Sequence, residues 1–192
     1  MTSPVTNAQR DLLRPVLDDH SPADALAVYY ALYHDTNRTA IFLYPEPADA
    51  AGTSGFLVRA QTGQDLFRPL VTYRAPSPEV ALKLFREGLQ AGRPYYFTVP
   101  LDLAGQVNKH LRVSDPAIHR VYQLAWEHYQ PIINVFVTRV TAPDGLSRYE
   151  VRRGDRAYAS AGVNWHSPRY AELYVYVDPS VRGRGWGKSV VA

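Results

Sequence analysis

The segment 172–189 constrains the fold of this chain more than any other part of its sequence. It opens with Glu-Leu-Tyr-Val-Tyr-Val, a run typical of a strand, and Pro179 ends the hydrogen-bond ladder soon after it. Glycines follow at positions 183, 185 and 187. Because glycine adopts positive φ and lets a ligand come close to the backbone, successive N–H groups of such a loop can face one anion. We therefore expect a strand, a glycine-rich loop and a helix start that together bind a phosphate group.

The spacing of the glycines distinguishes among the known phosphate-binding loops. The tripeptide Gly-Lys-Ser at 187–189 matches the end of a Walker A loop, but Arg182 stands where the first glycine of that loop belongs. A dinucleotide-binding loop needs G-x-G-x-x-G, whereas this chain has G-x-G-x-G. The pattern present is R-x-x-G-x-G, starting at Arg182 and closely following V-x-V-D-P. Arg182, Arg184 and Lys188 supply positive charge around the same loop.

This order of strand, proline, arginine and glycines resembles motif A of the GNAT N-acetyltransferase superfamily, whose loop holds the pyrophosphate of acetyl-coenzyme A. The resemblance implies that the backbone of Val175–Val177 pairs with the pantetheine arm, where this strand splays from its neighbour. It also implies that N–H groups of residues 183–188 bind the pyrophosphate. The residues thus assigned to coenzyme A are Val175, Tyr176, Val177, Arg182, Gly183, Arg184, Gly185, Trp186, Gly187 and Lys188. For Lys188, a solvated surface charge is an equal alternative.

Amine acetylation needs a group that accepts the ammonium proton, so that the nitrogen lone pair can attack the thioester. Glu172 lies early on the strand that leads to the loop, where some family members keep a glutamate, and it is the candidate catalytic residue. Strand alternation places Glu172 on one face with Tyr174 and Tyr176, which would shape the acceptor site. The alternatives are an exposed or paired strand glutamate and a packing role for both tyrosines.

Residues 1–113 are predicted to form an α/β segment with parallel pairing, because strands and helices alternate along it. Ser21-Pro22 and Ser77-Pro78-Glu79 are helix-start signals. The predicted helices cover 21–34, 77–92 and 102–111, and the predicted strands cover 39–44, 55–60, 66–73 and 95–99. This order resembles the middle of the GNAT fold, but the corresponding loop at 74–79 has no glycine. Two interpretations of residues 1–113 stay open: a degenerate copy of the GNAT fold that binds no phosphate, and an unrelated α/β segment.

Residues 114–192 are predicted to form a second domain, the front part of a GNAT N-acetyltransferase with its first four strands and the pyrophosphate loop. An antiparallel meander with a turn at 142–145 is expected from strands at 132–141, 147–153, 157–165 and 171–177. The fold class is therefore α/β with a mixed sheet, GNAT-like and incomplete at the C-terminus. The family continues past motif A, whereas this sequence stops at Ala192. We expect a truncated chain that is a poor catalyst by itself, with the tyrosine that often protonates the leaving thiolate in the missing part. The alternative is that another chain supplies the missing strands.

The resemblance implies an acetyl-coenzyme A-dependent N-acetyltransferase that moves the acetyl group directly to a primary amine. The acceptor is a small molecule or a peptide, and the sequence does not identify it. Two alternatives stay open: a non-catalytic GNAT-like module that binds coenzyme A or a partner protein, and a nucleotide-binding protein that uses Gly-Lys-Ser at 187–189. A homodimer is compatible with the sequence.

Composition excludes several other classes of protein. The 192 residues include no cysteine, which excludes disulfides and thiol catalysis and fits a cytoplasmic location. No stretch approaches about 18 consecutive apolar residues, so no membrane-spanning helix is predicted. A net charge of +3 from 21 basic and 18 acidic residues is too weak to indicate nucleic-acid binding. His110, His119 and His128 lack the spacing of a metal site, so no metal is expected.

Overall fold

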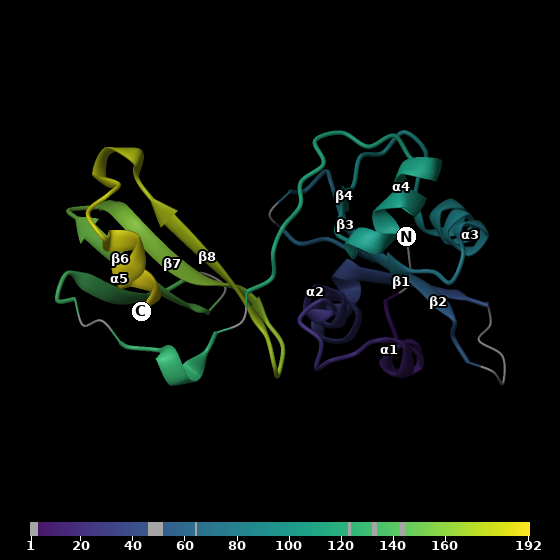
Figure 1. The fold of residues 1–192 in the computed structure, drawn as a ribbon, viewed down its shortest axis with the longest axis horizontal. Helices are drawn as coiled ribbons and strands as arrows, with labels where there is room; N and C mark the ends of the chain where they lie inside the picture. Colours follow the sequence, from purple (N-terminus) through teal and green to yellow (C-terminus); the bar gives the residue numbers. More distant parts are fainter. Residues whose placement is uncertain (1–3, 46–51, 64, 123, 132–133, 143–144) are drawn as a thin grey trace. The chain divides into compact units, whose positions relative to one another are not determined.

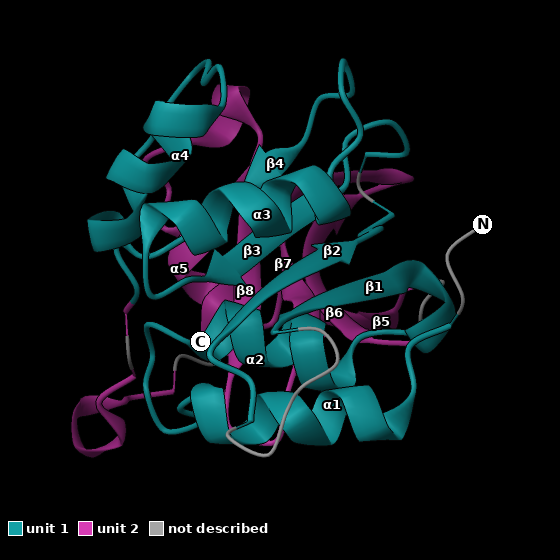
Figure 2. Ribbon diagram, turned by 90° about the vertical axis from the view of Figure 1, so that its right-hand side faces the viewer, with its two compact units in different colours: residues 1–121 teal, residues 122–192 magenta. Residues whose placement is uncertain are grey.

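A computed structural model describes residues 4–45, 52–63, 65–122, 124–131, 134–142 and 145–192. The chain divides into two compact units, residues 1–121 and 122–192, which Figure 2 shows in separate colours. Each unit contains one four-stranded sheet, so the fold is mixed α/β with two sheets. No helix in the described part of the chain is long and apolar enough to cross a membrane.

Unit 1 is built around a sheet with the strand order β1-β2-β3-β4 (Figure 1). Strands β1, β2 and β3 form an antiparallel meander, and helix α3 connects β3 to β4, which pairs parallel with β3. The parallel pairing predicted from the order of elements is therefore confirmed, although β4 covers only two residues of the predicted strand 95–99. The elements of unit 1 are α1 (Asn7–Leu13), the 3-10 helix η1 (Arg14–Val16), α2 (Ala25–Val28), the π-helix η2 (Tyr29–Tyr33), η3 (Thr36–Arg38), β1 (Thr39–Tyr44), β2 (Gly55–Ala60), β3 (Leu70–Arg74), α3 (Pro78–Gly88), β4 (Tyr96–Phe97), η4 (Leu101–Leu103) and α4 (Ala104–His110).

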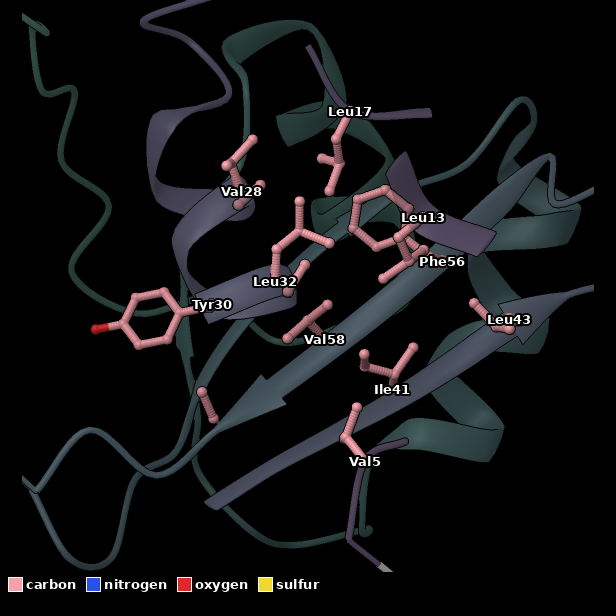
Figure 3. Close-up of a cluster of buried hydrophobic side chains, with 13 residues drawn as sticks. Val5, Leu13, Leu17, Val28, Tyr30, Leu32, Ile41, Leu43, Phe56 and Val58 are labelled. Carbon is pink, nitrogen blue, oxygen red and sulfur yellow. The ribbon is translucent and has the colours of Figure 1, made fainter. Parts of the chain in front are cut away.

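Helices cover both faces of this sheet because its strands send alternate side chains into two apolar clusters. Phe56 and Val58 of β2 pack with Leu32 of η2 in the cluster drawn in Figure 3. Leu57, which lies between them in the sequence, belongs to the other cluster together with Leu84 of α3. A run of consecutive buried apolar residues is typical of a strand that is covered on both faces.

Helix α3 begins where its sequence signal predicts. The N-cap Ser77 accepts a hydrogen bond from the N–H of Val80 at 3.4 Å, and proline occupies the first helical position. The helix ends at Gly88 rather than near Gly92. A Cβ atom on Gly88 would lie 2.7 Å from Cδ2 of Leu57, so the last turn of α3 approaches the sheet too closely for a larger residue.

The helix predicted at 21–34 starts later than expected. Its first four residues form a turn in which the N–H of Asp24 donates to the carbonyl of Ser21 at 3.0 Å. Helix α2 begins only at Ala25, with Asp24 at the N-cap position. The Asp24 carboxylate forms an ion pair with Arg74 of β3, a contact between distant parts of the chain that the local pattern did not show.

The strand predicted at 66–73 also starts late, at Leu70. The Asp65 side chain accepts hydrogen bonds from the N–H groups of Phe67 at 2.8 Å and Arg68 at 3.1 Å, which bends the chain before the strand. Phe67 is consequently 80% exposed. Side-chain capping of this kind competes with strand pairing and here outweighs the apolar pattern.

Unit 2 is an antiparallel meander in the order β5-β6-β7-β8, followed by the short helix α5 (Figure 1). Its elements are η5 (Trp126–His128), β5 (Val137–Thr141), β6 (Ser147–Arg153), β7 (Arg156–His166), β8 (Ala171–Val177), η6 (Pro179–Val181) and α5 (Trp186–Val191). The predicted meander is confirmed, but its first strand starts at Val137 rather than at 132. The Asn134 side chain accepts a hydrogen bond from the N–H of Phe136 at 3.0 Å, and residues 134–136 do not join the sheet. Residues 132 and 133, at the start of the first predicted strand, and residues 143 and 144, in the predicted turn, lie outside the described residues.

Helix α5 packs on one face of the second sheet. Val190 of α5 is buried in a small cluster with Val151, Ala159 and Ala161, and Trp186 packs against this cluster. These contacts hold α5 against β6, β7 and β8. The segment between β8 and α5 is thereby fixed at both ends.

The segment that leads from unit 1 to unit 2 should be a preferred site of proteolysis. Residues 112–122 are exposed and contain no helix or strand. Because exposed chain without ladder hydrogen bonds can extend into a protease active site, we expect brief trypsin treatment to cut after Arg112 or Arg120. Mass spectrometry should then identify fragments that begin at Met1 and at Val113 or Val121. Resistance of this segment while β2 is cut would contradict the division into two units.

Candidate functional site

Asp178, the residue after β8, holds the turn that leads into the glycine-rich loop. Its N–H donates to the carbonyl of Tyr158 on β7 at 2.8 Å. Its Oδ1 accepts hydrogen bonds from the hydroxyl of Ser180 at 2.6 Å and from the Ser180 N–H at 2.9 Å, and Oδ2 forms an ion pair with Arg156. The hydrogen bonds from Ser180, followed by that from Arg156, lower the pKa of Asp178 to about 2. The carboxylate therefore stays charged and keeps the turn in place.

Acid should weaken this turn. The pKa of Asp178 is about 2 in the folded protein, against an ordinary value of 3.8, so the unfolded chain takes up the proton first as the pH falls. The stability contributed by Asp178 is present above about pH 4 and is lost as the pH falls through about 2. We expect Asp178→Asn to flatten the pH dependence of the urea midpoint in this window. Asp155→Asn, in the exposed β6–β7 turn, is the matched control, and identical curves for Asp178→Asn and the wild type would refute the assignment.

The glycine-rich loop leaves open space beside its backbone. Gly183 and Gly185 have φ of +80° and +77°, which residues with a side chain rarely adopt. A Cβ atom at either position would meet no atom of the described residues within 4 Å. Gly187 has a different role, because a Cβ there would lie 3.1 Å from Cγ2 of Val177. The lack of a side chain at Gly187 lets α5 pack closely against β8. Gly183 and Gly185 leave the loop accessible to a ligand.

Three cationic side chains surround this loop. Arg182, Arg184 and Lys188 are exposed, and none of them forms an ion pair with any residue that the structure describes. The Nε of Arg182 donates to the carbonyl of Val177 at 3.4 Å, which brings this side chain back to the end of β8. Unpaired charges beside an open loop favour the binding of an anion such as a phosphate.

Strand β8 forms an edge of its sheet, and within the described residues no strand pairs with its outer side. The N–H of Asp178 points to β7. Since an antiparallel ladder alternates, the N–H and C=O groups of Leu173, Val175 and Val177 point away from β7. The contact of Arg182 with the Val177 carbonyl agrees with this direction. An extended ligand or strand can therefore find backbone donors and acceptors along β8.

Glu172 lies at the other end of β8 from the loop. The strand has 7 residues, which corresponds to roughly 20 Å. The Oε2 of Glu172 accepts a hydrogen bond from Nδ2 of Asn164 at 3.0 Å. Tyr174, on the same face of β8, packs on the sheet, because a Cβ atom on Gly162 would lie 2.8 Å from its hydroxyl oxygen. Tyr176 is half-exposed on this face.

The structure therefore brings the predicted loop residues together with the end of β8 and keeps Glu172 apart from them. Sequence analysis missed the network of Asp178, Ser180 and Arg156. The Asp-Pro-Ser tripeptide after a strand is a signal for an Asx turn and could have indicated the contact between Asp178 and Ser180. The contribution of Arg156 depends on the β7–β8 register, which the sequence does not fix.

The fold and the site define an α/β protein with two sheets, the second of which ends in a turn and an open, positively charged glycine loop. Comparison with protein-family models, curated proteins and solved structures finds no match to this chain. The described residues contain no group of three or more His, Asp or Glu side chains placed to hold a metal ion.

Proposed function

We propose that this chain provides the coenzyme-binding part of an acetyl-coenzyme A-dependent N-acetyltransferase of the GNAT type. The observation that carries the proposal is one continuous unit: the free edge of β8, the turn held by Asp178, and the open loop with its unpaired cations. The acceptor would be a primary amine on a small molecule or a peptide. This unit has the order of features that the sequence shares with motif A.

Coenzyme A has two parts, one of which suits the glycine-rich loop and the other the free edge of β8. Its pyrophosphate would lie against the N–H groups of residues 183–188, where Arg182 and Arg184 add charge. Its pantetheine arm contains amide groups, which would pair with the outward N–H and C=O groups of Val175 and Val177 as an added strand does. Lys188 would add further charge to the pyrophosphate side.

Acetyl transfer would proceed by attack of the acceptor nitrogen on the thioester carbonyl carbon. The C–N bond forms, the C–S bond breaks, and coenzyme A leaves as a thiolate, while the ammonium proton must move to a base. Because the pantetheine arm separates the pyrophosphate from the thioester, a base is expected away from the loop. Glu172 fits this position, and its hydrogen bond with Asn164 would orient the carboxylate.

The second candidate is a non-catalytic module that binds coenzyme A or a partner protein. One observation favours it: the carboxylate of Glu172 is already engaged by Asn164. A Walker-type nucleotide site has less support. The hydroxyl of Ser189, which would have to bind magnesium there, donates to the carbonyl of Gly185 at 3.3 Å and accepts from Nδ2 of Asn134 at 3.0 Å.

Unit 1 repeats the local plan of unit 2 without its loop. In both units an antiparallel meander is followed by a helix: α3 comes three residues after β3, and α5 comes after β8, the 3-10 helix η6 and the glycine-rich loop. The connection before α3 contains no glycine, and Ser77 caps the helix start. These features support the interpretation of unit 1 as a degenerate GNAT-like copy that binds no phosphate.

Calorimetry with coenzyme A, acetyl-coenzyme A and ATP tests the proposal. We expect both coenzymes to bind and ATP to bind much more weakly. Release of free thiol from acetyl-coenzyme A in the presence of a primary amine would separate the enzyme from the non-catalytic module. Binding of ATP without binding of coenzyme A would exclude the GNAT assignment.

Replacing Arg182 should have a moderate effect that depends on salt. The side chain is exposed, so its attraction for phosphate is screened, and Arg182→Ala should weaken coenzyme A binding by up to about fivefold at low salt. The loss should shrink as the ionic strength rises. Arg153→Ala, an exposed arginine of β6, is the matched control and should leave the affinity unchanged. Equal effects of the two variants would place the anion elsewhere.

A further inference from the structure

Strand β8 has the composition of an edge that pairs with another strand. Its sequence, Ala-Glu-Leu-Tyr-Val-Tyr-Val, contains no lysine, arginine or proline, the residues that commonly protect exposed edges. Leu173 is 60% exposed, and Val175 is half-exposed on the same face. Leu173 also lines an apolar hollow of about 330 Å³ between the sheet and the end of α5. Among the described residues, no hydrogen bond is made by the outward backbone groups of Leu173 and Val175, and exposed apolar side chains lie beside them.

We propose that β8 pairs antiparallel with β8 of a second copy of this chain, about a two-fold axis at Tyr174. This register pairs all seven residues of the strand. Leu173 lies opposite the partner's Val175, and because both residues turn their backbone groups outward, each such pair exchanges two hydrogen bonds. The apolar side chains of the two pairs meet on one face.

The two neighbouring registers, with the axis at Leu173 or at Val175, each pair only five residues of the strand, and charge further disfavours the axis at Val175. With the axis at Tyr174, Glu172 lies opposite the partner's Tyr176, and the carboxylate faces a hydroxyl group. A shift of the axis to Val175 would place Glu172 opposite the partner's Asp178, and like charges in direct opposition destabilise a strand pair. The two-fold arrangement also closes the edge, because each copy of β8 covers the outer side of the other.

The contact is small. One strand pair with its flanking side chains buries less surface than a standard stable interface, so we expect a concentration-dependent dimer with a micromolar or weaker dissociation constant. The proposal does not depend on coenzyme binding. It uses the same outward groups of Val175 and Val177 that the pantetheine arm would use, so coenzyme and partner would compete if both proposals hold.

Disulfide trapping tests the register directly, because the chain has no cysteine of its own. Tyr174 turns its backbone groups toward β7, so in the proposed dimer Tyr174 and its symmetry mate form a non-hydrogen-bonded pair with Cα atoms about 4.5 Å apart. This separation suits a disulfide. Tyr174→Cys should give a covalent dimer on mild oxidation. Tyr176→Cys, the matched control, should not, because its symmetry mate lies several residues away along the strand.

Sedimentation equilibrium without coenzyme provides a second, independent measurement. Leu173→Lys places a charge in the apolar pair and should weaken the dimer at least about tenfold. Val191→Lys is the matched control: Val191 is 48% exposed and lines the same hollow, but it lies on α5, away from the edge, so the dimer should persist. This comparison does not depend on the folding of the Tyr174 variant.

Several results would overturn the proposal. They are a wild-type protein that stays monomeric at every concentration, cross-linking by Val175→Cys in place of Tyr174→Cys, growth into particles larger than a dimer, and equal loss of the dimer in both lysine variants. If the dimer forms and coenzyme A does not bind, the pairing of β8 stands and the acetyltransferase proposal fails. If coenzyme A binds to a chain that never dimerises, the pairing of β8 fails and the proposed function stands.

Discussion

Gly185→Val should abolish measurable binding of coenzyme A while leaving unit 2 folded. Gly185 precedes α5 with φ of +77°, and valine, which is β-branched, is strained in that region by about 1–3 kcal/mol. The new side chain would meet no described atom of the protein, so its main effect is to fill the space where the pyrophosphate would lie. We expect at least about a hundredfold loss of affinity by calorimetry, because both the shape of the loop and the access to its N–H groups change.

A matched control separates backbone strain from loss of the site. Gly154, in the β6–β7 turn, also has positive φ, +58°, and open space around a built Cβ atom. Gly154→Val should therefore cost similar stability and keep the affinity for coenzyme A. If folded Gly185→Val binds as tightly as the wild type, the ligand lies elsewhere and the proposed function loses its main support.

The parts of the site that were predictable from the sequence are those fixed by neighbouring residues. Pro179 and the glycines at 183 and 185 act on their own backbone, so the end of β8 and the start of α5 follow from local pattern. The N-cap of α3 at Ser77 follows for the same reason. Each of these features needs only a few consecutive residues, and each is present in the structure.

The features that sequence analysis missed depend on residues far apart in the chain. Asp24 lies inside the helix predicted at 21–34, but it occupies the N-cap position of α2 and forms an ion pair with Arg74 of β3. Arg156 meets Asp178 only because β7 and β8 pair in a particular register. The same limit applies to Glu172, whose partner Asn164 is the extra residue of a bulge between β7 and β8.

Apolar pattern alone also misjudged one segment, for a different reason. Leu66 and Phe67 continue the apolar run of β3 toward its N-terminal side, yet both are exposed. The carboxylate of Asp65 captures the N–H groups that a strand would have used for pairing. The apolar character of a residue therefore predicted its environment correctly only where the backbone was free to join the sheet.

Phe56→Ala should strongly destabilise unit 1. Phe56 is 0% exposed and lies in the cluster between the N-terminal helices and the sheet (Figure 3). Truncating a fully buried phenylalanine removes its apolar contacts and leaves a cavity, at a cost of about 3–5 kcal/mol. A domain of this size is stable by about 5–15 kcal/mol, so the variant should approach the limit of folding. Phe67→Ala, at an 80% exposed position, is the matched control and should change stability by less than about 0.5 kcal/mol.

The positions of the tryptophans allow the unfolding of the two units to be followed separately when the Phe56→Ala variant is unfolded with urea. All three tryptophans, at 126, 165 and 186, lie in unit 2, whereas unit 1 contains tyrosines and no tryptophan. Urea unfolding followed by tyrosine absorbance and far-ultraviolet circular dichroism should therefore show an early transition in Phe56→Ala. Tryptophan fluorescence should keep its wild-type midpoint, because the apolar cluster described for unit 2 is formed by side chains of β5 to β8 and α5. An equal shift of both signals would show that the two units unfold as one, and equal midpoints for Phe56→Ala and Phe67→Ala would show that Phe56 does not stabilise unit 1.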